Sequence, residues 1–431
     1  MGVPINYNLR NLIERKGTTF MTAVGIGLTV AVLVTSLALT AGLKTVFGGT
    51  GDPRQMLVLR KGVDAELTST VSNDAYQIIR RLPGIATDAK GEPLVSPEGI
   101  TVVNLPSVEA PAGMNVTVRG MLPIGVSMRD VKILQGEMFK PGLRQIVVGE
   151  SIARRYPDAR IGKQVRFGRG LWEVVGVFKV GESAANSEIW VDLNQLRGDF
   201  EQQGGSSSLL IRADLPLDAA IAQAAAAERE YEKAVAARKA AVKANGGNEE
   251  GIPTVEDPLP PKLAEFRKLV ADDQRLGSSV IGEKNYYAKQ TESGAPLQAL
   301  GFAVAIIMAV GSAFAATNTM YAAVARRARE IATMRALGFG RWAILRSFML
   351  ESICLALFGG LVGIALALPI NGLTTGVGSF VTFSEVAFKF KVGSDAILTG
   401  LIFAAIIGAI GGFLPAWSAS KKNIVTTMRD L

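Results

Sequence analysis

The sequence predicts an α-helical membrane protein with four transmembrane helices and an α+β extracytoplasmic domain that carries a helical insertion. Four apolar stretches are each long enough to cross a bilayer, and a long stretch of mixed polarity separates the first from the second. Of the 431 residues, 48% are hydrophobic and only 19% are charged, and the mean hydropathy is +0.28. This composition is too apolar for an ordinary soluble protein and too charged for a chain that lies in the membrane throughout.

Composition also excludes several classes of chemistry. The chain has no histidine, which rules out Ser-His-Asp and Cys-His catalysis and histidine metal ligation. Its one cysteine, Cys354, lies in an apolar stretch and is expected to be a packing residue. The sequence contains no Gly-x-x-x-x-Gly-Lys-Ser/Thr loop and no cluster with metal-ligand spacing. We therefore expect no catalytic, cofactor-binding or metal site in this chain, and no enzymatic activity of its own.

The basic charge of the chain, a net +8, gathers beside the apolar stretches. Lysine and arginine are enriched in the cytoplasmic flanks of membrane helices, so this charge predicts an orientation and not a nucleic-acid partner. Basic residues mark the N-terminus, the loop between the second and third apolar stretches, and the C-terminus. Four transmembrane helices with both termini in the cytoplasm satisfy all three positions and place the large domain outside.

The first half of the chain contains the membrane anchor and the extracytoplasmic domain. Residues 1–19 are expected to form a cytoplasmic amphipathic helix, with a frayed basic terminus as the alternative, and residues 20–43 the first transmembrane helix, an uncleaved anchor. Residues 44–217 are expected to form the α+β domain, with a serine-capped helix at 72–82 and a hairpin at 164–178. The other expected strands are 55–59, 100–105, 115–120, 145–148, 188–191 and 209–212.

The composition changes at residue 218. Residues 218–275 are rich in Ala, Glu, Lys and Arg, which are strong helix formers, and their centre is rich in Gly and Pro. We expect them to form a helical hairpin insertion that projects from the domain. A solvated insertion with no partner explains the same composition equally well. Residues 276–296 are expected to be the return segment to the membrane.

The rest of the chain is mostly embedded in the membrane. The expected segments are transmembrane helix 2 at 297–320, a cytoplasmic loop at 321–341, helix 3 at 342–368, an outer loop at 369–395, helix 4 at 396–415 and a cytoplasmic tail at 416–431. Glycines recur four residues apart in the last two helices, at Gly359 and Gly363 and at Gly408 and Gly412. Such spacing lets helix backbones approach closely, within the chain or across a dimer, although glycine is common in membrane helices in any case.

The stretch at 321–363 is the most informative part of the chain. It carries six arginines in a short space, together with Glu330. A basic loop this short between two membrane helices faces the cytoplasm, so we interpret it as a contact element that leads into the third helix. Inside that helix Glu351 is a lone charge, which is costly in a membrane. It is expected to pair with Arg346 or with a neighbouring helix.

Several motifs, in order along the chain, are similar to those of one family. They are YNLRNLIERK at 7–16, VVGESIA at 147–153, WEVVGVF at 172–178, NTMY at 318–321, REIATMRALG at 329–338, Glu351 with Gly359 and Gly360, and Pro415 with Ala416. With this layout the chain resembles the FtsX/MacB-type (type VII) permeases of ATP-binding cassette (ABC) transporters, over nearly all of its length apart from about 224–267. The resemblance implies a MacB-like periplasmic core domain at 44–217.

The resemblance also implies partners and a location. These are two separate ABC ATPase subunits per complex, which bind ATP and Mg, a second permease that is identical or a sister chain, a periplasmic adaptor protein, and the lipid of a bacterial inner membrane. The cytoplasmic loop supplies the coupling helix to the ATPase. The residues implied in coupling are Arg329, Glu330, Ile331, Met334, Arg335, Leu337 and Gly338. Among them three apolar residues form an edge for a groove on the ATPase and the charged ones fix its orientation, unless the arginines only hold the topology.

The leading hypothesis is therefore a permease subunit that couples ATP hydrolysis by a separate ATPase to extracytoplasmic work. That work is efflux, extraction of lipid or lipoprotein, or signalling to a cell-wall enzyme, and mechanotransmission carries it. The alternative is a non-transport membrane scaffold or signalling protein whose extracytoplasmic domain binds a partner. The sequence leaves open the substrate, the choice between homodimer and heterodimer, and the role of the insertion.

Overall fold

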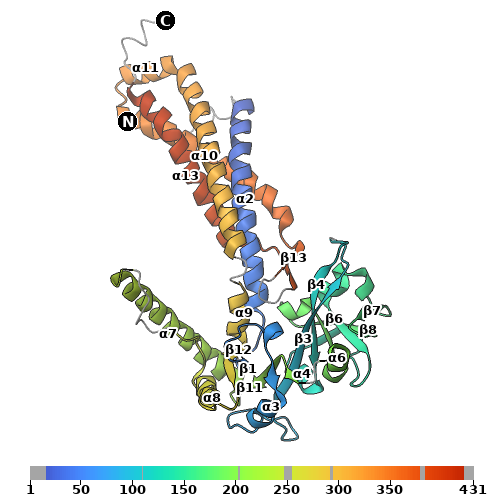
Figure 1. Ribbon diagram of the computed structural model, residues 1–431. Coiled ribbons are helices and arrows are strands. Elements are labelled where there is room, and N and C mark those ends of the chain that lie inside the picture. The colour runs from blue at the N-terminus through green and yellow to red at the C-terminus, as the bar shows by residue number, and fades with distance from the viewer. Residues whose placement is uncertain are drawn as a thin grey trace. The chain divides into compact units, whose positions relative to one another are not determined.

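The chain divides into two compact units in the computed structural model (Figure 1). The structure describes residues 16–108, 110–201, 204–246, 255–291, 295–378 and 384–421. Unit 1 comprises Met1–Gly42, Gly294–Thr374 and Lys389–Leu431, and unit 2 comprises Leu43–Ser293 and Thr375–Phe388. Most of the amphipathic helix predicted at 1–19, and the tail beyond residue 421, lie outside the described residues.

Unit 1 is a bundle of long helices. Their bounds are α2 (Lys16–Gly48), α10 (Ala295–Arg326), α12 (Arg341–Ala367) and α13 (Ser394–Lys421). All four are long and apolar enough to cross a membrane, as the continuous apolar runs predict. A short helix, α11 (Ala328–Ala336), connects α10 to α12. In the core of the bundle, Ile26 and Val30 of α2 pack with Ala356 of α12 and Ala404 of α13.

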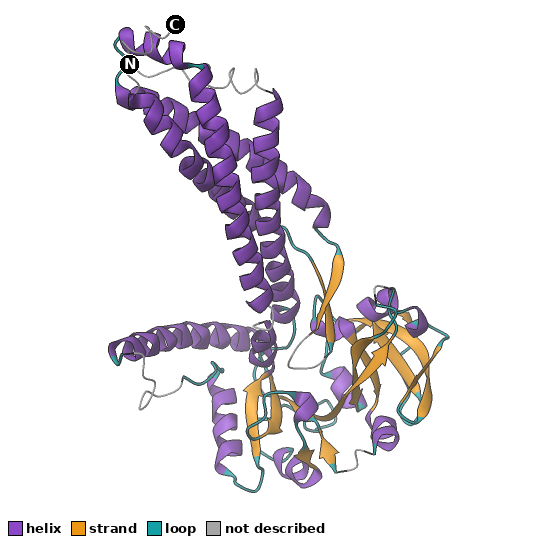
Figure 2. Cartoon of the chain, turned by 45° about the horizontal axis from the view of Figure 1, so that its top comes forward, coloured by secondary structure: helices purple, strands orange, loops and turns teal. Residues whose placement is uncertain are grey.

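Unit 2 is built on a mixed sheet that contains ten strands among the described residues. The strand order is β12-β1-β11-β3-β4-β9-β6-β8-β5, and β7 pairs with β8. The bounds are β1 (Gln55–Arg60), β3 (Val95–Leu105), β4 (Met114–Met121), β5 (Lys132–Gly136), β6 (Gln145–Gly149), β7 (Gln164–Phe167), β8 (Gly170–Lys179), β9 (Glu188–Asp192), β11 (Ser208–Arg212) and β12 (Ser278–Gly282). The pairs β4–β9 and β6–β8 are parallel and the other neighbours antiparallel. Figure 2 shows the strands with helices packed around them.

The sheet has a hydrophobic core on each of its two faces, because side chains alternate between the faces along each strand. In β6, Ile146 and Val148 join one core and Val147 joins another, because successive strand residues point to opposite faces. A further core at the β1 end of the sheet includes side chains from two helices, α3 (Asn73–Ile79) and α8 (Pro261–Asp272).

The strands and the first helix predicted from the sequence in this unit are confirmed. Each predicted β run lies inside a strand, and the predicted hairpin forms with Phe167 opposite Gly170. Ser72 caps α3 by accepting a hydrogen bond from the backbone N–H of Ala75 at 3.1 Å.

Two segments outside the predicted domain also belong to unit 2. The residues expected only to return to the membrane form β12, which pairs with β1, and the helix α9 (Glu283–Thr291). The expected outer loop contains β13 (Thr374–Gly378) and β14 (Glu385–Lys389), and Val386, Ala387 and Phe388 are buried in unit 2. Strand β12 thus pairs with a strand far away in sequence, whereas β13 pairs with β14, and side chains far away in sequence, such as Ser187, hold β14 in unit 2.

The helices of the expected insertion differ from a projecting hairpin. In Figure 1 helix α7 (Leu217–Ala244) extends away from the sheet, and Ala220 is the residue it buries. Helix α8 instead packs against the sheet, with Leu263, Phe266 and Val270 buried in its core. Helix α8 does not project, because it carries an apolar stripe at helical spacing, which needs a core to cover it.

Candidate functional site

The candidate coupling element is α11, with the turns that enter and leave it. It lies at the end of the bundle where α13 ends (Figure 1). Two backbone hydrogen bonds end the helix. The N–H of Leu337 donates to the carbonyl of Thr333 at 2.9 Å, and the N–H of Phe339 donates to the carbonyl of Met334 at 3.1 Å. Gly338 between them has φ +93°, a left-handed conformation that glycine adopts without steric cost. The sequence ALGFG therefore ends α11 and starts α12.

One face of α11 packs against the bundle. Ile331 is 1% exposed and Ala332 is buried with it. Ile331 belongs to a hydrophobic cluster with residues of α10, α12 and α13, and Met334 packs partly buried against it. The other members of the cluster are Met320, Val324, Ile344, Phe348, Ala416 and Ala419. The expected apolar edge is therefore divided, because Ile331 and Met334 face the bundle whereas Leu337 is 73% exposed. A short amphipathic helix between two long ones buries its apolar stripe on its neighbours.

A buried ion pair fixes the start of α11. Arg327 donates from Nη1 to Oε2 of Glu351 at 3.0 Å, and both residues are about 95% buried. The partner of Glu351 is thus the residue that joins α10 to α11, whereas Arg346 is exposed. Sequence reasoning missed Arg327 because it is one arginine among several, and only the fold brings it to the third helix.

The opposite face of α11 is open. Arg329, Glu330, Thr333 and Leu337 are exposed there. Arg335 is half-buried and donates to the carbonyl of Ser420, at the end of α13, at 3.3 Å. On the outer side of α11 the predicted coupling residues thus form an exposed face that carries charges of both signs and ends at Leu337. The inner side of the helix packs against the bundle.

The predicted packing glycines lie at helix crossings. A Cβ on Gly363 of α12 would lie 2.3 Å from the carbonyl oxygen of Gly27 in α2, and one on Gly359 would lie 2.8 Å from that of Ala23. Gly408 and Gly412 of α13 face α12 in the same way, with Ala356 and Ser352 as the nearest side chains. These contacts lie within the chain and do not require a dimer.

Hydroxyl groups add polar contacts between the same helices. Thr22 and Thr29 of α2 form hydrogen bonds of 2.8 Å with Thr319 and Ser312 of α10. Ser352 of α12 donates to the carbonyl of Gly408 at 2.7 Å. Such bonds contribute roughly 0.6 kcal/mol each in membrane proteins, so several of them help to fix which helix faces meet. Their spacing gives no distinct sequence signal.

In unit 2 the segment between α12 and α13 is held by polar contacts. Glu385 accepts hydrogen bonds from Arg155 at 2.5 Å and from the hydroxyl of Tyr156 at 2.7 Å, and all three are buried. The N–H of Ala387 donates to Oγ of Ser187 at 2.9 Å. The connection between two apolar helices is thus an integral part of the other unit.

A second cluster in unit 2 is centred on Arg119, which is 3% exposed. Its guanidinium bonds to three buried carboxylates, at 2.7 Å to Glu98, 2.9 Å to Glu188 and 3.0 Å to Glu66. Burial acts to raise the pKa of Glu188, but the charge of Arg119 and its hydrogen bond outweigh it and lower that pKa. The four residues of this cluster come from β3, β4, β9 and a short helical turn at 66–68, so no local motif predicts the cluster.

Two protein-family models match this chain, one over its first half and one over its last third. A family model described as MacB-like periplasmic core domain matches residues 19–229, and one described as FtsX-like permease C-terminal matches residues 302–424. The chain belongs to the FtsX/MacB-type family of ABC transporter permeases. Neither model matches residues 230–301, which include most of α7, all of α8 and β12.

Relatives of known name agree with this assignment. The macrolide export ATP-binding/permease protein MacB of Shewanella oneidensis is 25% identical over 448 residues, which cover 95% of this chain and 58% of the relative. The pyoverdine export ATP-binding/permease protein PvdT of Pseudomonas fluorescens is 36% identical over 129 residues, or 30% of this chain and 18% of the relative. This chain therefore spans little more than half the length of the first of these.

Among solved structures, the periplasmic region of MacB from Actinobacillus actinomycetemcomitans aligns with 43% of this chain and 85% of its own, at 13% identity and a TM-score of 0.30. The extracellular domain of the noncanonic ABC-type transporter YknZ aligns with 42% of this chain and 94% of its own, at 15% identity and a TM-score of 0.29.

Proposed function

We propose that this chain is the permease subunit of an ABC transporter in a bacterial inner membrane, with both termini in the cytoplasm and unit 2 outside. A separate ATPase binds ATP and Mg, and the permease converts its hydrolysis into extracytoplasmic work by mechanotransmission. The complex contains two ATPase subunits and two permease chains, identical or sister. Membership of the family and four helices of membrane length support the proposal.

The observation that carries this proposal is the two-sided construction of α11. Its inner face is part of the bundle core through Ile331, and Arg327 ties its start to Glu351 of α12. Its outer face presents exposed charges of both signs and the large apolar side chain of Leu337. A force applied to the outer face therefore moves α10 and α12, because the contacts behind it are buried and closely packed.

The segment between α12 and α13 can transmit this force to unit 2. The helices α12 and α13 are joined in sequence by the segment that contains β14, and this segment is anchored in unit 2 by Glu385. A change in the separation of α12 and α13 thus acts directly on unit 2. This route does not need substrate to pass through the helix bundle.

We assign the extracytoplasmic work to efflux, or to extraction of lipid or lipoprotein. The relatives whose names state an activity are exporters of macrolide and of pyoverdine, which favours efflux with a periplasmic adaptor. The relatives MacB and PvdT are named as ATP-binding/permease proteins, which supports an ABC ATPase as part of the proposed complex.

Purification of the full chain from its native membrane tests the coupling. We expect an ABC ATPase to co-purify with the wild type, and Leu337→Asp to weaken the association by at least about tenfold, because a docked leucine contributes roughly 1.5–3 kcal/mol. The matched control is Leu171→Asp, a leucine that is 55% exposed in strand β8 of unit 2.

The controls separate coupling from folding. Both leucine variants should unfold thermally like the wild type, since both side chains are exposed. Association that is equal in Leu337→Asp and wild type would remove the proposed role of α11. Failure to recover any ATPase would favour a membrane scaffold whose outer unit binds a partner.

A further inference from the structure

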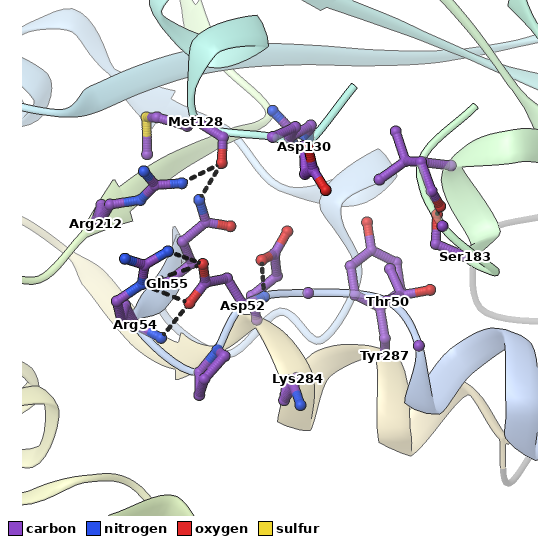
Figure 3. A pocket seen from close by; sticks show the side chains of 18 of the residues that line it. Thr50, Asp52, Arg54, Gln55, Met128, Asp130, Ser183, Arg212, Lys284 and Tyr287 are labelled. Atoms are coloured by element: carbon purple, nitrogen blue, oxygen red, sulfur yellow. Dashed lines mark hydrogen bonds and ion pairs between the residues drawn. The ribbon is translucent and has the colours of Figure 1, made fainter. Parts of the chain in front are cut away.

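Unit 2 contains a polar hollow that the proposed function does not use. It has a volume of about 580 Å³, within the range of small-molecule sites. Its walls come from residues 49–55, from 127–130, from the start of α9, and from Arg212 at the end of β11. Figure 3 shows Arg54 against Asp52 on one side, and Lys284 and Tyr287 of α9 on the other.

Most charged groups around this polar hollow are paired within the protein. Arg54 forms an ion pair with Asp52 at 2.5 Å, and Arg129 forms one with Glu98 at 2.6 Å. Arg119, which also lines the hollow, is bound by its three carboxylates. These groups have little capacity left for a ligand.

Glu283 is an exception. Its side chain lines the hollow and is 4% exposed, and one carboxylate oxygen accepts the N–H of Asp52 at 2.9 Å. The structure gives this carboxylate no second hydrogen bond among the described residues, and its other oxygen is not one of the fully buried polar atoms. Burial raises the pKa of Glu283 to about 7, against the opposing charge of Arg129. A buried carboxylate with an open oxygen is a receptor for a hydrogen-bond donor, and most strongly for a cationic one.

Arg212 is the second exception and has the opposite charge. Its guanidinium donates to the carbonyl of Met128 and forms no ion pair among the residues that the structure describes. Burial lowers the pKa of Arg212, and the nearby charge of Arg54 lowers it further. An anionic ligand group beside Arg212 would relieve both effects. Lys284, which is exposed at the same hollow, adds to the attraction.

A more apolar hollow of about 390 Å³ adjoins the polar one, and the two share Asp52, Pro53, Gln55, Ile221 and Lys284. Ile221 on α7 is 52% exposed, although it is a large apolar side chain. The other apolar walls come from α7 and from the residues that precede and begin α8. They are Ala224, Ala225, Pro258, Leu259, Pro260 and Leu263.

We infer that the two hollows together bind an amphipathic molecule whose head group carries both a primary ammonium and an anionic group. The ammonium donates to Glu283, the anionic group lies against Arg212, and the apolar chain follows Ile221 and Leu259. Each contact satisfies a group that the protein itself leaves open. This site goes beyond the proposed function, and binding at it does not require an ATPase.

Part of the site lies outside the stretches that the family models match. Glu283 and Leu259 lie in residues 230–301, which neither family model matches. Arg212 and Ile221, on the other walls, lie in the matched residues 19–229, so the site combines matched and unmatched stretches. This gives the insertion a role that its composition alone did not indicate.

Native mass spectrometry of the detergent-solubilised full chain tests the site. The probe is lysophosphatidylethanolamine, which has a primary ammonium, a phosphate and one acyl chain. We expect it to bind at least about tenfold more tightly than lysophosphatidylglycerol, which lacks the ammonium, or phosphoethanolamine, which lacks the chain. Lysophosphatidylcholine, whose ammonium has no N–H donor, should also bind more weakly.

Two variants locate the binding. Glu283→Gln should reduce affinity for lysophosphatidylethanolamine by about tenfold and leave lysophosphatidylglycerol unchanged, since only the ammonium contact is lost. Ile221→Asp should weaken both lipids, and Ile221→Ser is a milder version at this half-exposed position. The matched control is Glu137→Gln, whose side chain is 59% exposed, and it should bind like the wild type.

The inference is overturned if Glu283→Gln binds lysophosphatidylethanolamine as tightly as the wild type, or if lysophosphatidylglycerol binds equally well. It is also overturned if Ile221→Asp and Ile221→Ser retain full affinity. The test is independent of the coupling proposal, because Leu337→Asp should bind the lipid normally. Loss of lipid binding in Glu283→Gln should in turn leave ATPase association unchanged.

Discussion

Glu283 and Arg119 illustrate two ways in which this protein holds buried charge. Arg119 is surrounded by carboxylates at 2.7–3.0 Å, so its charge is compensated inside the protein. Glu283 receives one backbone N–H and faces a hollow. Burying a charge without full compensation is expensive, and proteins tolerate it mainly where a ligand or a proton completes the site.

The pKa of Glu283 leads to a prediction about stability. Burial raises this pKa to about 7, whereas an unfolded glutamate titrates near 4.5. Between these values the folded state holds a proton that the unfolded state lacks, so stability falls as the pH rises through this window. The loss is at most about 3 kcal/mol. The charged groups that influence Glu283 are Arg129, Glu98, Arg119, Arg212 and the neighbouring Lys284 and Asp52.

Chemical unfolding of the full chain from pH 5 to pH 8 measures this effect. Wild type should lose stability relative to Glu283→Gln as the pH rises, because the glutamine never ionises. Glu137→Gln, an exposed position, should follow the wild type throughout. Parallel curves for wild type and Glu283→Gln would mean that Glu283 titrates normally in the folded protein.

At the scale of elements, close glycine contacts determine how the bundle packs. The backbone of α12 touches α2 at Gly363, where an added Cβ would lie 2.3 Å from the oxygen of Gly27. We predict that Gly363→Ala forces these helices apart and destabilises the bundle by about 1–3 kcal/mol, the usual cost of overpacking. The measurement is thermal unfolding in detergent.

The matched control is Gly311→Ala in α10. An added Cβ there meets nothing within 4 Å, and alanine favours helix over glycine, so stability should be unchanged or slightly higher. If the two substitutions change stability equally, the backbones of α12 and α2 are not in close contact at Gly363.

Sequence reasoning predicted elements well where the signal is local. The apolar runs identified all four long helices, and alternation with turn residues identified the hairpin of β7 and β8. The four-residue spacing of Gly359 and Gly363 pointed to helix contacts that the structure contains. On α11 the spacing of Ile331, Met334 and Leu337 marked an apolar stripe, but periodicity cannot say whether a stripe faces a partner or the same chain.

The missed features depend on contacts between distant parts of the chain. Strand β12 pairs with β1 although most of unit 2 lies between them in sequence, and a strand of only five residues carries no distinctive pattern. Glu385 looked like an ordinary loop acid until the fold placed it on Arg155 and Tyr156. The site around Glu283 likewise joins residues from 49 to 287, which no spacing rule connects.

For the whole molecule, we propose one mechanical route. In this proposal energy from a separate ATPase enters at the exposed face of α11, passes through the bundle along α12 and α13, and reaches unit 2 through the segment held by Glu385. The chain belongs to a family of ABC transporter permeases, and the mechanical route is the part that we propose.

Hydrogen exchange at β14 tests this claim most directly. The full chain with its co-purified ATPase is compared with ADP and with ATP plus vanadate, and the exchange of the backbone amides of Glu385–Lys389 is measured. We predict that ATP plus vanadate changes exchange in this strand in the wild type, and that Leu337→Asp abolishes the change while Leu171→Asp preserves it. Exchange at β14 that is the same in both nucleotide states, with the ATPase bound and active, would contradict the account.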